Sequence, residues 1–422
     1  MEADRLICIF VLTGAMAYAQ QPSPPPAKIT LDQALELAAK HNHSLQAARS
    51  TITQNLAQEV TANLRPNPSL SWDSQFLPLF NLPQLASADY FNTTAQFDFG
   101  VGYTIERGRK RQNRLQAAKD QTAVTRSQVL DNERTLSFNV AQQFVAVLLA
   151  ESTLDLANQD LKSYQQTIDI SEARVQAGDM SEGDLIKIKL QLLQFQQDVS
   201  AAKLSRVQAL AALRQLVGFE SVPEDYDVEG TLEYKPVTGT EDELRSLAMQ
   251  SRPDLTAARQ SIIAANSQVA LARANGKKDL GVSFNYSHVG AENSAAFFFN
   301  MDIPLFDRNQ GEIARTQAVV TQANELYREA SEQISSDVTT AWEGLKTNAE
   351  VVGLFRSGYL DQTTQSRDIS EYAYEHGAAP LLDFLDAERS YRANQLAYRQ
   401  ALAAWMVSLE QLRTAVGTRN LP

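Results

Sequence analysis

The run of 69 residues from Arg109 to Ala177 contains neither glycine nor proline. At a rise of about 1.5 Å per residue, such a run predicts one helix on the order of 100 Å long. Apolar residues recur in it every seven positions, at Val140, Val147, Leu154, Leu161, Ile168 and Val175. This spacing is typical of a coiled-coil seam. A turn at residues 178–183 and renewed apolar three-four spacing predict a long helical hairpin.

The chain repeats itself once. Residues 45–49 (LQAAR) recur as 255–259 (LTAAR), and 213–218 (LRQLVG) recur as 412–417 (LRTAVG). Gly178 and Asp184 recur as Gly377 and Asp383. We therefore expect two structural repeats, 29–218 and 241–417, each with a helix, a β-hairpin and a long helical hairpin. Between them an acidic, Pro- and Gly-containing linker, 219–240, is expected to be irregular, and 418–422 form a tail.

Each repeat begins with an expected helix and continues with two strands. The first helices are expected at about Leu31 to Leu64, with Thr30 as N-cap, and at about Glu241 to Ala274. The strands are expected at about 69–76, 95–105, 279–289 and 295–303. Along them, apolar side chains alternate with small polar ones, for example Phe97 to Ile105 against Gln96 to Thr104. This pattern favours strands with lipid on one side and water on the other; a soluble, half-buried sheet is the alternative.

The second repeat departs from the first along its long helices. Gly344, Gly353 and Gly358 predict a break or bend in the first of them. In the last helix, from Leu381 onward, the three-four spacing has two polar exceptions, Glu388 and Gln395.

Four strands are too few for a closed barrel, since small barrels need about eight. An open sheet in lipid would leave unpaired backbone groups on both edges, each costing several kcal/mol. If the strands lie in a membrane, several chains must share one barrel.

The N-terminus carries an apolar stretch, Leu6 to Ala17, followed by a small-x-small site at residues 17–19. We interpret 1–19 as a signal peptide and the Pro-rich residues 20–28 as a leader. The one cysteine, Cys8, falls within the signal. Cleavage would therefore exclude disulfides, cysteine metal sites and thiol catalysis. No later segment is apolar for about 18 residues, so membrane entry is expected only as a β-barrel.

Composition and motifs argue against nucleic-acid binding and catalysis. The net charge is −12, and no long basic run is present. The four histidines, His41, His43, His288 and His376, lack the spacing of metal ligands. No nucleophile triad, phosphate loop or dinucleotide fingerprint occurs. We expect no enzyme activity, no cofactor and no metal site.

Several motifs together resemble the TolC family of outer-membrane efflux proteins over nearly the whole mature length. They are the duplicated plan, residues 31–35 (LDQAL), 304–311 (PLFDRNQG) and 382–387 (LDFLDA), and the two Val-Gly repeat ends. The resemblance implies an α+β membrane protein: a homotrimer whose twelve-stranded outer-membrane barrel continues as a periplasmic α-helical barrel. Residues 105–111 (IERGRKR) look most like the heavy-metal, CzcC-like branch.

In that family, the channel docks on a periplasmic adaptor and an inner-membrane pump, here of the RND type. The implied function is a passive exit duct for small molecules or metal cations. A protein or peptide secretion conduit of the same fold is one alternative. A periplasmic coiled-coil scaffold without a pore is another, although it leaves the lipid-like strand faces unexplained.

Two aspartates are the candidate pore gate. Asp383 and Asp386 lie three residues apart at the start of the last helix, so they share a face. The matching family residues form a constriction ring, which in a trimer would hold six carboxylates that attract cations. The alternative is an ordinary helix start, where acids offset the helix dipole. Where some family members carry Arg just before the aspartates, this chain has Ala379.

The candidate adaptor-docking sites are the two helical turns. Gly178 and Asp184 mark the first turn, and Gly377 and Pro380 mark the second. The matching turns of the family dock on the adaptor. A plain hairpin turn with glycine as C-cap explains the same residues, and the two interpretations are compatible.

Overall fold

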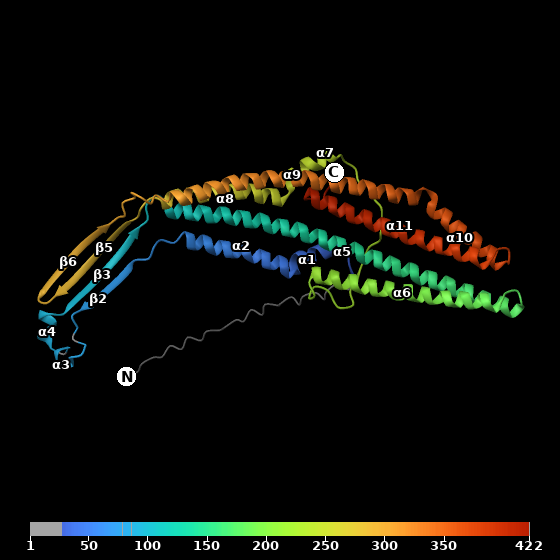
Figure 1. Cartoon of the computed structure of the whole chain (residues 1–422), viewed down its shortest axis with the longest axis horizontal. Coiled ribbons are helices and arrows are strands. Elements are labelled where there is room, and N and C mark those ends of the chain that lie inside the picture. The colour runs from blue at the N-terminus through green and yellow to red at the C-terminus, as the bar shows by residue number, and fades with distance from the viewer. Residues whose placement is uncertain (1–27, 78, 86, 422) are drawn as a thin grey trace, which may run out of the picture.

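The computed structural model describes residues 28–77, 79–85 and 87–421. The molecule is long and bowed, with a sheet at one end from which helices extend to the other (Figure 1). The signal peptide expected at 1–19 and residues 20–27 of the expected leader lie outside the described residues. Lys28, the last leader residue, belongs to a short strand.

The sheet is antiparallel, with strand order β2-β3-β5-β6. The strands are β2 (Ser69–Gln75), β3 (Gln96–Ile105), β5 (Leu280–Val289) and β6 (Glu292–Asn300). The last strand was expected at 295–303 and begins three residues earlier. The β5–β6 turn consists only of Gly290 and Ala291, and Gly290 adopts a φ of 58° that favours glycine. The β2–β3 loop is longer and holds two short helices, α3 (Leu82–Leu85) and α4 (Ala88–Thr93).

The strand register gives the sheet one apolar face. Trp72, Phe99 and Tyr286 lie side by side across three strands. The next apolar row joins Leu70, Val101, Phe284 and Phe297. Trp72 is 77% and Phe297 is 72% exposed in the single chain. Large aromatic side chains this exposed on one continuous face require a lipid or protein partner.

The opposite face carries small and polar residues. Ser71, Gly100 and Asn285 lie side by side there. A Cβ on Gly100 would lie 2.5 Å from the Ser71 hydroxyl and 2.6 Å from the Asn285 side-chain oxygen, so the sheet is closely packed on this face. Phe298 is an apolar exception.

Both expected first helices are in fact pairs. In the first repeat, α1 (Leu31–His41) and α2 (His43–Ala62) meet at Asn42, whose side chain accepts a hydrogen bond from Leu45 N at 3.0 Å. The Asn42 amide also donates to Leu216 O, at 2.9 Å. This break escaped prediction because His43 continues the helical pattern without glycine or proline.

In the second repeat, α7 (Glu241–Ser251) and α8 (Pro253–Asn275) meet at Arg252. Pro253 holds Arg252 in an extended conformation, with ψ of 125°. The buried Arg252 guanidinium pairs with Asp254 at 2.6 Å and Asp337 at 2.8 Å. Two carboxylates thus compensate a cation that burial alone would destabilise.

Long helices make up the rest of the molecule. The first repeat has α5 (Lys110–Ala177) and α6 (Glu182–Val217); the second has α9 (Gln310–Leu354), α10 (Leu360–Glu375) and α11 (Leu381–Val416). A π-helical turn, Phe355–Tyr359, separates α9 from α10, and Gly358 there has a φ of 115°. The expected bend therefore falls at Gly358, whereas Gly344 and Gly353 lie within α9.

One helix of the described chain, α5, is long and apolar enough to cross a membrane by length and composition alone. Half of its most apolar window is buried inside the molecule. A buried core helix has the same properties, and α5 packs against α2, α6, α8 and α11.

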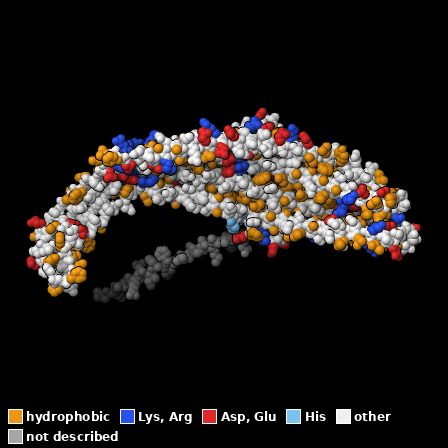
Figure 2. All heavy atoms as spheres, in the orientation of Figure 1, with side chains coloured by type: hydrophobic (Ala, Val, Ile, Leu, Met, Phe, Trp, Pro, Cys, Tyr) orange, Lys and Arg blue, Asp and Glu red, His pale blue; other side chains and the backbone are white. Residues whose placement is uncertain are grey.

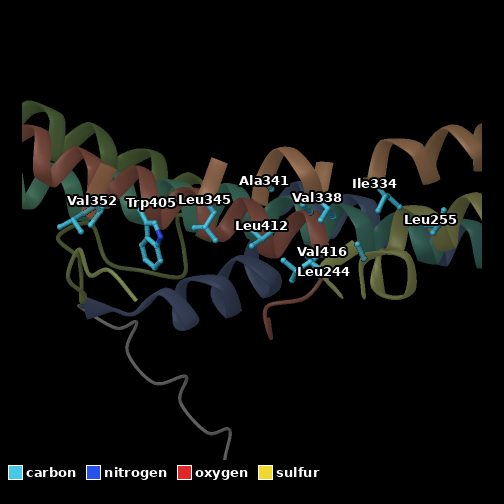
Figure 3. Packing of buried hydrophobic residues seen from close by; sticks show 13 residues of the cluster. Leu244, Leu255, Ile334, Val338, Ala341, Leu345, Val352, Trp405, Leu412 and Val416 are labelled. Carbon is cyan, nitrogen blue, oxygen red and sulfur yellow. The ribbon is translucent and has the colours of Figure 1, made fainter. Parts of the chain in front are cut away.

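The main core lies midway along the helices, where α7, α9 and α11 meet. Figure 3 shows Leu345, Trp405 and Leu412 pointing into it. A second cluster joins α1, α5 and α6 to the linker. The linker, expected to be irregular, contains β4 (Asp227–Val228), which pairs in parallel with β1 (Lys28–Ile29). Ile29 is fully buried, so this pairing closes the second cluster.

Candidate functional site at the helical tips

The α5–α6 turn lies at the end of the molecule farthest from the sheet (Figure 1). Gly178 ends α5 with a φ of 81°, and its amide donates to the carbonyls of Arg174 and Val175. Ser181 caps α6 by accepting a hydrogen bond from Asp184 N at 3.1 Å. The Asp184 carboxylate accepts from Lys187 and from the Ser181 hydroxyl, both at 2.9 Å, and these bonds lower its pKa.

The α10–α11 turn lies at the same end (Figure 1) and also contains a left-handed glycine, but Pro380, unlike Ser181, makes no side-chain cap. Gly377 has a φ of 74°, and Pro380 is the N-cap residue of α11. Gly178, Gly377 and Pro380 are exposed, and Asp184 is partly exposed. The four residues expected to dock on a partner therefore belong to two neighbouring turns at one tip of the molecule.

Tyr374, at the end of α10, holds the two turns together. Its hydroxyl lies 3.1 Å from the Ser171 hydroxyl and 3.6 Å from the Met180 sulfur. Arg174 donates to the Tyr374 carbonyl at 2.6 Å and lies over its ring, 5.2 Å from the centroid. Phe384 stacks on the same ring, with centroids 5.3 Å apart. A small aromatic core thus fixes one repeat's tip against the other's.

Arg392 of α11 forms a second link between the repeats. It pairs with Asp160 at 3.1 Å and with Asp198, and it lies over the Phe195 ring at 4.1 Å. Burial raises the pKa of Asp160, and the nearby Arg392 charge offsets part of that effect. The guanidinium therefore neutralises two carboxylates from the first repeat in a partly dehydrated position.

Glu388 lies one helical turn before Arg392 and is 7% exposed. Its carboxyl makes no hydrogen bond or ion pair with the described residues. Burial and, secondarily, the charge of Asp160 raise its pKa to about 7, against smaller opposing effects of Arg367 and Arg392. The polar interruption at Glu388 in the apolar spacing was the one sequence signal for this cluster. Asp160 and Arg392 gave no such signal, because charged residues on long helices are usually solvated.

The two gate candidates lie just beside this cluster. Asp383 and Asp386 occupy the first two turns of α11, and both side chains are exposed in the single chain. Asp386 pairs with Arg389, and the Asp383 amide donates to Pro380 O at 3.2 Å. Their exposure leaves both carboxylates accessible to solvent or to another chain. Over the described part of the chain, no three His, Cys, Asp or Glu side chains converge as metal ligands would.

The same fold occurs in solved outer-membrane channels. One CusC structure superposes with a TM-score of 0.75 at 21% identity, covering 92% of both chains. The Campylobacter jejuni CmeC outer membrane channel gives 0.75 at 16% identity, over 92% of this chain and 85% of CmeC. The open Neisseria gonorrhoeae MtrE channel gives 0.74 at 20%, over 92% and 89%. The chain has the fold of an outer-membrane channel protein.

Sequence comparison defines the family. Residues 34–219 and 244–418 match the profile of the outer membrane efflux protein family. The cobalt-zinc-cadmium resistance protein CzcC of Cupriavidus metallidurans is 24% identical over 388 residues, 92% of this chain and 89% of CzcC. The cation efflux system protein CusC of Escherichia coli O157:H7 is 25% identical over 415 residues, 92% and 85%. The chain belongs to the outer membrane efflux protein family and is an outer-membrane protein.

Proposed function

We propose that this protein is the passive outer-membrane exit duct of a tripartite efflux system. Three chains would share one twelve-stranded barrel, which their helices continue as a periplasmic tunnel. The four-stranded sheet is the main support for this proposal. Within the described structure, β2 and β6 each pair on one side only, while one face is apolar and the other polar. Joining β6 of one chain to β2 of the next satisfies both edges.

The proposed solutes are metal cations. Relatives are named for cobalt, zinc and cadmium resistance and for cation efflux, although another, OpmQ of Pseudomonas putida, is named for pyoverdine export at 25% identity. Asp383 and Asp386 from three chains would place six carboxylates near the tip. Such a ring raises the local cation concentration.

The proposed partners are a periplasmic adaptor, docked on the turns at Gly178 and Gly377, and an RND-type inner-membrane pump. The chain itself would act as a channel and not as an enzyme.

Because Cys8 is the only cysteine and lies in the expected signal, single-cysteine variants can map the contact with the adaptor. Asp179→Cys and Ala378→Cys are expected to cross-link to the adaptor in cells. Lys203→Cys, exposed on the flank of α6, is the matched control.

The duct is tested by reconstituting the purified protein in planar bilayers. Discrete conductance steps are expected, with cation preference. A pore-free scaffold would give no conductance in any lipid composition. Solute identity is tested in a strain lacking its own channel, where this chain with its pump and adaptor is expected to restore growth on zinc, cobalt or cadmium. Growth restored only on organic compounds would contradict the metal assignment.

A further inference from the structure

The junction between sheet and helices concentrates positive charge in an acidic protein. The chain crosses it four times, at 63–68, 106–109, 276–279 and 301–309. Together with Lys110 and Arg111, the first two residues of α5, these segments contain eight Lys or Arg and four Asp or Glu, although the whole chain has a net charge of −12. Figure 2 shows the Lys and Arg side chains gathered there. We call these four segments, with Lys110 and Arg111, the basic belt.

The belt is confined to one end of the strands. The sequence has no Lys or Arg between residues 66 and 105 or between 280 and 307. The sheet and the loops at its far end therefore contain no Lys or Arg. Their Asp and Glu residues give this part of the chain a net negative charge. At about 3.4 Å per residue and a tilt of about 40°, the 10-residue β3 spans about 26 Å along the membrane normal. This length matches an apolar band about 25 Å tall, so the belt lies at one edge of the band.

Half of the cations in the basic belt have no polar side-chain partner in the described structure. Arg65, Arg109, Arg111 and Lys277 make no side-chain hydrogen bond or ion pair with any residue that the structure describes. Arg65, Arg109 and Lys277 are exposed, and Arg111 is partly exposed. The other cations are partnered inside the belt, for example Lys110 with Asp279 at 2.7 Å.

Contacts between the crossings hold the belt in place. The Asp279 carboxylate also accepts the Arg107 amide at 2.9 Å, which joins the second crossing to the third. A Cβ on Gly276 would lie 2.6 Å from the Arg308 carbonyl, so the fourth crossing lies directly against the start of the third. Asn309 donates to Ala272 O at 2.7 Å. The free cations therefore project from a preorganised frame, which lowers the entropic cost of binding.

An apolar loop stands beside these cations. Ile303, Leu305 and Phe306 of the β6–α9 connection are 73%, 64% and 90% exposed. Arg308 holds the loop by donating from Nε to Pro304 O at 3.1 Å. Exposed apolar side chains next to cations fit an amphiphile, whose headgroup is anionic and whose chain is apolar.

We propose that the basic belt binds anionic phospholipid headgroups in the leaflet that faces the helices, with the 303–306 loop inserted among the acyl chains. The proposal rests on the proposed seating of the sheet in a bilayer. Charge complementarity selects this occupant, because the phosphodiester is the anion at the depth where the apolar band ends. Each Lys or Arg near an anionic membrane surface strengthens binding by about fivefold.

Native mass spectrometry tests this proposal. Full-length protein is kept in neutral detergent with equal amounts of phosphatidylglycerol and phosphatidylcholine, and the lipids that stay bound to it are measured. Wild type is expected to retain about fivefold more phosphatidylglycerol. The belt variant, with Arg65, Arg109, Arg111 and Lys277 all changed to Gln, is expected to lose this preference. The matched control changes four exposed, unpaired cations of the described helices to Gln: Arg126, Lys162, Lys203 and Arg259. It is expected to keep the preference.

An unchanged preference in the belt variant, or its equal loss in the control, would overturn the proposal. If the belt variant fails to fold, a wild-type salt titration decides: the preference must fall between about 0.05 and 0.5 M salt, since screening weakens it. Soluble glycerol phosphate is expected not to displace the lipid; full displacement would identify a free-phosphate site instead. The conductance of wild type in neutral lipid distinguishes failure of this proposal from failure of the proposed duct. A protein that conducts but has no lipid preference would contradict only the proposed lipid binding by the basic belt.

Discussion

Arg392 of α11 and Asp160 of α5 lie 3.1 Å apart across the boundary between the two repeats. The Asp160 side chain is 8% exposed, so its charge depends on this partner. Breaking a buried pair by removing one partner costs about 3–5 kcal/mol, because the remaining charge stays buried. The contact therefore fixes the second repeat's tip against the first.

Arg392→Ala is expected to destabilise the helical tip by about 3 kcal/mol, since it leaves Asp160 and Asp198 without their cation. The readout is hydrogen exchange of α6 and α11, which should accelerate near the tip. Arg389→Ala is the control. Its pair with Asp386 is exposed, and such pairs contribute at most about 1 kcal/mol. Equal effects of the two changes would argue against a buried link.

Glu388 should make the tip less stable as pH rises. Its pKa is about 7 in the folded chain, against 4.5 for the ordinary group. Between these values the folded state binds more protons than the unfolded state, so stability is lost as pH increases from about 4.5 to 7. The full difference is about 3 kcal/mol. Asp160 and Glu371 oppose its ionisation, while Arg367 and Arg392 favour it.

Glu388→Gln is expected to remove this dependence: it should match wild type at pH 4 and exceed it at pH 8. Thermal unfolding followed by circular dichroism at several pH values measures the effect. Glu375→Gln, an exposed change at the end of α10, is the control and should retain the wild-type slope. An unchanged slope in the Glu388→Gln variant would show that Glu388 is ionised in the folded state.

Replacing both Asp383 and Asp386 with Ala is expected to weaken cation block and cation preference of single channels, because six carboxylates leave the proposed ring. Reversal potentials in asymmetric salt and block by divalent cations measure the change. Asp179→Ala, on the neighbouring turn, controls for charge at the tip in general. Unchanged selectivity in the double variant would leave only the helix-start role for these residues.

The two faces of the sheet should respond differently to charge. Phe284→Arg places a cation on the apolar face, at an expected cost of about 2–4 kcal/mol. Asn285→Arg places the same side chain on the polar face beside Gly100, where water would solvate it. The yield of assembled protein in outer membranes should fall for the first and persist for the second. Equal yields would contradict the assignment of faces.

Much of the fold could be predicted because periodicity reports burial directly. The seven-residue spacing in 109–177 predicted α5, and the period-two segments predicted all four strands to within a few residues. The helix break at Asn42 escaped prediction because no glycine or proline marks it, and its side chain is held in part by a contact with distant Leu216. The break at Arg252 was missed although its cause is local. Pro253 was a local signal for the second break.

The candidate site was predictable only in part. Glycines at 178 and 377 mark turns from sequence alone, since a left-handed conformation favours glycine. The cluster of Arg392, Asp160 and Glu388 brings together residues more than 200 positions apart in sequence. No local pattern reports such a pairing. The basic belt likewise appears only when the fold brings its four segments to one level.

The mass of the extracted particle would show whether several chains share one barrel. Full-length protein would be expressed in a Gram-negative host, extracted from outer membranes in mild detergent and measured by light scattering with the detergent contribution subtracted. A particle of three chains is expected in the outer-membrane fraction. A soluble periplasmic monomer or dimer would contradict the shared barrel, because four strands with two open edges cannot lie in lipid alone.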